Sequence, residues 1–195
     1  KGNKVMEVLL SAVSPMQLMG GKILGQAGVS LVMLVMYGGA GMAALFAFAM
    51  LDLVPMMHLL YLALYFIMAY FMIATIMTAI GSAVTELRDA QSLMGPAMLL
   101  LIIPLALWPI VGEHPNGTLA TVTGFIPPLT PFIMIQRVTA ATEPVAAWQI
   151  IASLVIGFAA VAIMLWMCAR IFRIGVLAQG KPPGFMQLLR WVRMG

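Results

Sequence analysis

The sequence predicts an all-α fold, a polytopic bundle of four transmembrane helices, and three observations lead to it. First, 63% of the 195 residues are hydrophobic and only 8% are charged, too few for the surface of a soluble domain. Second, four long stretches carry no Asp, Glu, Lys or Arg, and each exceeds the roughly 20 residues that cross a bilayer as a helix. Third, the basic residues gather outside these stretches, as charge sorting across a membrane requires. We predict spans at about 23–50, 56–81, 92–111 and 145–169, within a single domain over residues 1–195.

Residues 1–22, before the first span, are amphipathic rather than apolar throughout. The polar side chains recur at helical spacing and form one stripe, which consists of Lys4, Glu7, Ser11 and Ser14. Ser14 is typical of an N-cap, and Pro15 suits the first position of a new helix. We therefore expect a short surface helix that turns a corner at Pro15 into a long apolar helix. Two interpretations stay open: this surface helix rests on lipid headgroups, or it contacts a soluble partner.

Small and aromatic residues predict how the first two spans pack. Gly21, Gly25 and Gly28 lie at helical spacing at the start of the first span, so another helix can approach closely there. We expect packing within the chain, with a subunit interface as the alternative. In the second span, Tyr61 and Tyr65 lie one turn apart and are expected to anchor that helix at the outer membrane interface.

The connection between the second and third spans is the most polar short stretch between spans. We expect a solvated turn, with a second contact to a cytoplasmic partner as the alternative. The residues concerned are Glu86, Arg88, Asp89 and Gln91. The third span contains Pro104 and Pro109, so that helix should be kinked.

Residues 112–144 cannot form one straight helix, because Pro127, Pro128 and Pro131 interrupt the charge-free run from His114 to Gln136. We predict an extracytoplasmic loop with a short re-entrant element, and we assign the three prolines to an outer gate.

Charge sets the predicted orientation. With four spans, both ends of the chain lie on one side of the membrane, together with every Lys and Arg except Arg137. We expect the chain to lie in the plasma membrane or inner membrane of the cell. The positive-inside rule then places both of its ends in the cytoplasm. Residues 170–195 form a cytoplasmic tail that closes on an amphipathic helix over 185–193, lying on the membrane surface.

Catalytic and cofactor motifs give no further assignment, so we expect no cofactor, no metal and no nucleic acid to bind this chain. Gly175 to Lys181 has the spacing of a phosphate-binding loop, but Pro182 stands where the metal-binding Ser or Thr belongs. The single cysteine, Cys168, excludes an internal disulfide. Any energy for transport is therefore expected to come from another subunit.

The order of several short motifs resembles exporter-type ABC transporter permeases, most closely the sodium- and drug-export branch. The similar stretches are KGNKVMEVLLS (1–11), SPMQL (14–18), GGKILG (20–25), AIGSAV (79–84), PPLTPF (127–132), RIFRIG (170–175) and LLRW (188–191). The resemblance implies a subunit of six spans, of which this chain holds the last four, in a homo- or heterodimer of permease halves.

It also implies a partner ABC ATPase subunit that binds ATP and Mg²⁺ and docks on residues 1–22. Lys4, Glu7, Ser11 and Ser14 would face that subunit, and motion would pass across Pro15 to the first span. The implied activity is ATP-driven efflux of ions, drugs or lipids. A non-transporting membrane scaffold is the alternative; an ion-coupled carrier is disfavoured, because the spans lack charged pairs.

Overall fold

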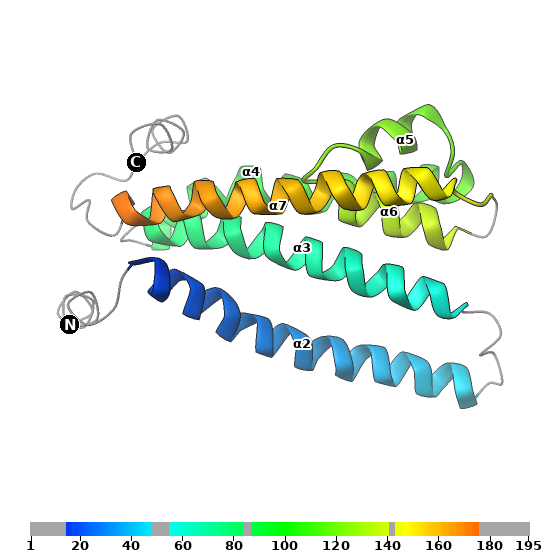
Figure 1. Cartoon of the computed structure of the whole chain (residues 1–195), viewed down its shortest axis with the longest axis horizontal. Coiled ribbons are helices and arrows are strands. Elements are labelled where there is room, and N and C mark those ends of the chain that lie inside the picture. Colours follow the sequence, from blue (N-terminus) through cyan, green and yellow to red (C-terminus); the bar gives the residue numbers. More distant parts are fainter. Residues whose placement is uncertain (1–14, 48–54, 84–86, 141–142, 176–195) are drawn as a thin grey trace.

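The computed structural model describes residues 15–47, 55–83, 87–140 and 143–175, and these form helices joined by turns (Figure 1). The helices in chain order are α2 (Pro15–Ala47), α3 (Met56–Ala83), α4 (Leu87–Glu113), α5 (Thr118–Gly124), α6 (Thr130–Thr139) and α7 (Ala147–Gly175). Four of them, α2, α3, α4 and α7, are long and apolar enough to span a membrane. The predicted all-α bundle with four membrane spans is therefore confirmed. The expected surface helix before Ser14 and the expected tail helix over 185–193 lie outside the described residues.

The first and third helices begin earlier than the spans that the charge-free runs delimit. α2 starts at Pro15 and includes Lys22, because a lysine near a helix end can extend its amine toward the membrane surface. α4 starts at Leu87, so Arg88, Asp89 and Gln91 belong to its first turns. The expected solvated turn is correspondingly shorter. Charge delimits the apolar part of a membrane helix but not the helix itself, which continues into the polar interface.

The centre of the bundle is the parallel pair of α3 and α7, which has the most extensive contact of any two described helices. Gly157 of α7 makes this contact possible, because a Cβ atom there would overlap the side chain of Met68, which is fully buried. One hydrogen bond of 2.7 Å joins the hydroxyl groups of Tyr65 and Ser153 across the same interface. The expectation that Tyr65 anchors at the membrane surface is wrong, because this side chain is 1% exposed and faces α7.

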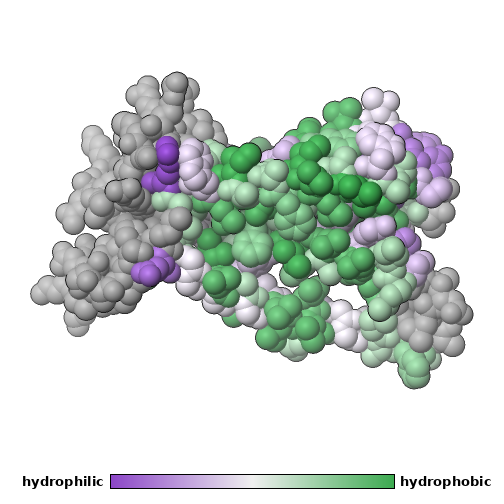
Figure 2. Space-filling view, viewed as in Figure 1, coloured by the Kyte–Doolittle hydropathy of each residue, from purple (hydrophilic) through white to green (hydrophobic). Residues whose placement is uncertain are grey.

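The short helices α5 and α6 lie beside one end of the long helices, whereas α2 begins and α7 ends at the other end (Figure 1). We call these the cap end and the terminal end. α6 packs against α3 and α4, and Met134 and Val138 extend the core between α3 and α7. Figure 2 shows hydrophobic residues over the middle of one face and polar residues toward both ends, as expected for a membrane-embedded bundle.

α2 lies at the edge of the bundle and is held mainly at its start. Met19 and Ile23 are buried against Cys168 of α7, and the Tyr70 hydroxyl of α3 donates a 2.6 Å hydrogen bond to the carbonyl of Ile23. Beyond this contact, most side chains of α2 are exposed. The expected packing of its glycines within the chain is wrong, since a Cβ at Gly21, Gly25 or Gly28 would meet no described atom within 4 Å.

Candidate functional site

Most of the predicted ATPase-coupling segment lies outside the described residues, which include Pro15 but not Lys4, Glu7, Ser11 or Ser14. Pro15 is the first residue of α2, the position where a proline costs no helix hydrogen bond. Of the expected second cytoplasmic contact, Glu86 is also outside the described residues. Arg88 and Asp89 lie in the first turns of α4, and Gln91 follows there with an exposed side chain.

The attachment of α2 joins the end of the coupling segment to the central helix pair. Met19 and Ile23 lie one turn apart and contact Cys168, which is itself buried. Tyr70 adds its hydrogen bond to Ile23 from the other helix of the pair. The first turns of α2 are therefore attached to both α3 and α7.

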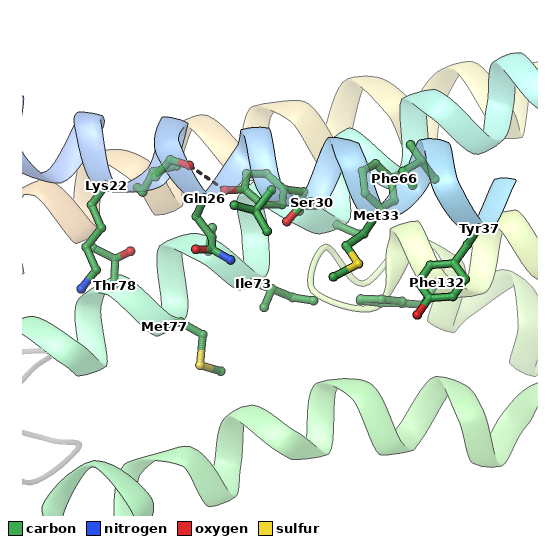
Figure 3. A pocket seen from close by; sticks show the side chains of 16 residues that line it. Lys22, Gln26, Ser30, Met33, Tyr37, Phe66, Ile73, Met77, Thr78 and Phe132 are labelled. Carbon is green, nitrogen blue, oxygen red and sulfur yellow. Dashed lines mark hydrogen bonds between the residues drawn. The ribbon is translucent and has the colours of Figure 1, made fainter. Parts of the chain in front are cut away.

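Beside this attachment, α2 and α3 enclose an open groove of about 930 Å³. Polar side chains of α2 line one wall, namely Lys22, Gln26, Ser30 and Tyr37, and Thr78 of α3 lies opposite Lys22 (Figure 3). The remaining walls are apolar, with Phe66, Ile73 and Met77 from α3. Phe132 of α6 lies at the cap end of the groove, near Tyr37 (Figure 3).

At the cap end, the predicted outer-gate prolines surround the connection between α5 and α6. Pro127 and Pro128 are half-buried in the turn before α6, and Pro131 is fully buried in the first turn of that helix. With its 10 residues, α6 is too short to cross a bilayer. Its backbone is covered by α3, α4 and α5, which is the condition for irregular chain at membrane depth.

The cap is organised around Arg137 of α6, a fully buried side chain. The guanidinium donates hydrogen bonds to the Pro115 carbonyl (2.6 Å), the Thr121 hydroxyl (3.2 Å) and the Gln149 side-chain oxygen (2.5 Å). It also contacts the Met134 sulfur at 3.3 Å. A single side chain thus joins the loop after α4, helix α5, helix α6 and the start of α7.

Burial lowers the pKa of Arg137, but a guanidinium remains protonated in proteins. Its described hydrogen-bond partners are all neutral, so several oriented dipoles stabilise the charge instead of a carboxylate. Gly124 leaves room for this arrangement, because a Cβ there would lie 3.1 Å from both the guanidinium and the Met134 sulfur. The neighbouring Gln136 amide donates to the Pro104 carbonyl of α4 at 3.2 Å, so the cap also binds the proline-containing helix.

Comparison with known proteins identifies the family. A family model described as ABC-2 family transporter protein matches residues 1–170. The chain belongs to the ABC-2 transporter family. It is 30% identical over 206 residues to the uncharacterized protein YhaP of Bacillus subtilis (strain 168), covering 100% of this chain and 49% of the relative. It is 28% identical over 181 residues to the uncharacterized protein MJ1024 of Methanocaldococcus jannaschii, covering 91% of this chain and 43% of the relative. No solved structure matches.

This ABC-2 chain thus spans about half the length of the curated relatives that it matches. The match agrees with the resemblance found in the ordered motifs, and the four long apolar helices agree with a multi-pass membrane protein of this family.

Two features of this ABC-2 chain were not assigned a role from the sequence. Gly157 is one glycine among 18, and no local pattern sets it apart. Arg137 did carry a signal, because it is the only Lys or Arg on its predicted side of the membrane. A charge in an apolar region is normally held by protein groups and has a function, and that rule would have singled out Arg137.

Proposed function

We propose that this chain is the membrane-spanning part of an ATP-driven exporter, in which a separate ATPase subunit docks on residues 1–22 and moves α2. The supporting observation is the family match over residues 1–170, which includes the whole predicted coupling segment. ATP and Mg²⁺ bind the ATPase subunit and not this chain. A second permease half completes the transporter. The chain lies in the plasma membrane or inner membrane, with both of its ends in the cytoplasm.

The attachment of α2 suggests how motion is transmitted. The ATPase subunit displaces the coupling segment, and α2 follows across Pro15, since Met19 and Ile23 hold its first turns against α7. The pair of α3 and α7 is joined by the Gly157–Met68 contact and the Tyr65–Ser153 hydrogen bond. The pair therefore moves as a unit and carries the displacement to the cap. There, Arg137 holds the outer gate of Pro127, Pro128 and Pro131 to the start of α7. The exported substrate is an ion, a drug or a lipid.

Replacing Glu7 with lysine tests the coupling assignment. We expect Glu7→Lys to abolish the stimulation of ATP hydrolysis by substrate in the full transporter, while membrane insertion stays unchanged, because a reversed charge disrupts a charge-complementary docking surface. Glu113→Lys makes the same charge change on an exposed residue at the cap end and should leave the stimulation intact. Retention of stimulated hydrolysis in Glu7→Lys would refute docking at this stripe.

Impermeant thiol labelling in intact cells tests the orientation. In a background with Cys168, the single cysteine, replaced by alanine, a cysteine at Asn116 should be labelled from outside. Asn116 is exposed in the loop before α5, which makes it accessible to the reagent. A cysteine at Gln187 should react only after the cells are permeabilised. The reverse pattern would invert the topology and place the coupling segment away from any cytoplasmic ATPase.

A further inference from the structure

We propose that the groove between α2 and α3 is the seat of a further membrane-spanning helix of the full-length protein, with hydrogen-bond acceptors that face Lys22, Gln26 and Ser30. This inference concerns an interaction surface and does not depend on coupling to ATP.

The polar wall of the groove requires a polar occupant. Lys22, Gln26 and Ser30 follow one another at intervals of four residues, so their side chains lie on one face of α2. All three point into the groove (Figure 3). None of these side chains is hydrogen-bonded to the part of the chain that the structure describes. Gln26 and Ser30 lie one and two turns deeper in the span than Lys22, and such groups are costly to leave facing hydrocarbon. Acceptors on a neighbouring helix are the usual solution inside a membrane.

The length of the groove favours a helix over a compact ligand. Its lining on α2 runs from Lys22 to Tyr37, which corresponds to about 22 Å along the helix axis. That distance is most of the roughly 30 Å thickness of the hydrocarbon core. α3 forms the floor over about 18 Å, from Phe66 to Thr78. A second helix fits such a long, straight site.

The rim of the groove permits close approach. Gly25 lies one turn from both Lys22 and Val29, which line the groove, and nothing described lies within 4 Å of a Cβ at Gly25. A helix can therefore lie near the α2 backbone at the depth where Lys22 and Gln26 offer their donors.

The same polypeptide is the favoured source of this helix. The match covers 49% of the Bacillus relative and 43% of the Methanocaldococcus relative, so each carries about as many residues again outside it. A lipid chain could fill the apolar floor but would offer nothing to Gln26 and Ser30. The ladder of donors predicts acceptors on the occupant about 6 Å apart, with a carboxylate nearest Lys22.

Site-specific photo-cross-linking of the full-length protein in its native membrane tests the proposal. A benzophenone amino acid replaces Met33, which lines the groove and is 51% exposed, or Val35, which is 65% exposed. Two residues along a helix turn the side chain by about 200°, so Val35 is a matched control on the opposite side. We expect the probe at Met33 to form an intramolecular cross-link to a peptide outside residues 1–195, in several-fold excess over Val35.

Two results would overturn the proposal: lipid adducts alone at Met33, or cross-links from Met33 mainly to a second copy of the chain, which doubles the apparent mass of the product.

A second measurement asks whether a substitution in the groove raises or lowers the thermal stability of the full-length protein. Gln26→Leu should lower the midpoint of thermal unfolding of the full-length protein by about 2–4 °C, because an acceptor on the seated helix loses its donor. If lipid covers the groove, the same substitution should leave the midpoint unchanged or raise it.

Discussion

Replacing Gly157 with leucine is expected to force α7 away from α3 and to destabilise the bundle by about 1–3 kcal/mol through overpacking. Even a single Cβ at this position overlaps the sulfur and terminal methyl of Met68, and the Met68 side chain is fully buried. The separation should also break the Tyr65–Ser153 hydrogen bond, because both contacts join the same two helices. Thermal unfolding of the purified protein, followed by size-exclusion fluorescence, measures the loss.

Gly28→Leu is the matched control, since a Cβ at Gly28 meets nothing described within 4 Å. It should change the unfolding midpoint far less than Gly157→Leu. Combining Gly157→Leu with Met68→Ala should cost less than the sum of the two single substitutions, because the smaller side chain vacates the space that leucine needs. Strict additivity of the two would mean that Gly157 and Met68 are not in contact.

Replacing Arg137 with methionine is expected to release the cap from α7. Methionine has a similar length but donates no hydrogen bond, so the Pro115 carbonyl and the Gln149 oxygen lose their donor. Each buried acceptor left without a partner costs roughly 1–3 kcal/mol. A cysteine placed at Ala120, which is buried in α5, should then react with a maleimide many times faster than in the parent protein.

Thr139→Ala in the same helix is the control, because, within the described part of the chain, the exposed Thr139 hydroxyl bonds only to carbonyls of its own helix. It should leave the reactivity at Ala120 unchanged. Arg137→Lys should give an intermediate rate, since lysine retains the charge but cannot reach three acceptors with a planar fork. Equal reactivity in the parent protein and in Arg137→Met would show that other contacts hold the cap.

The sequence was sufficient for the membrane helices because the bilayer imposes a simple rule. A chain in hydrocarbon must satisfy its own backbone groups, so each long apolar run becomes a helix. The positions of the charged residues predicted where each apolar run begins and ends. They did not predict that the helices continue into polar sequence, as α2 does at Lys22 and α4 at Arg88.

The packing faces were much harder to predict. In a soluble helix the apolar side points inward, but a membrane helix is apolar on every side, so its periodicity does not identify the buried face. For this reason Tyr65 was expected at the membrane surface and lies in the core. A Cβ at Gly28, where a contact was expected, would meet nothing described within 4 Å, whereas a Cβ at Gly157, which received no role, would overlap Met68.

The sequence by itself determined the class of the protein, its four spans and its family. These properties depend on composition, run length and the order of short motifs, all of which are local in the chain. The tertiary structure alone decided that Arg137 is the centre of the cap, since Pro115, Thr121 and Gln149 come from three separate segments. It alone placed Lys22, Gln26 and Ser30 in a groove with α3. Such positions arise when helices far apart in sequence pack side by side, and no local pattern encodes that choice.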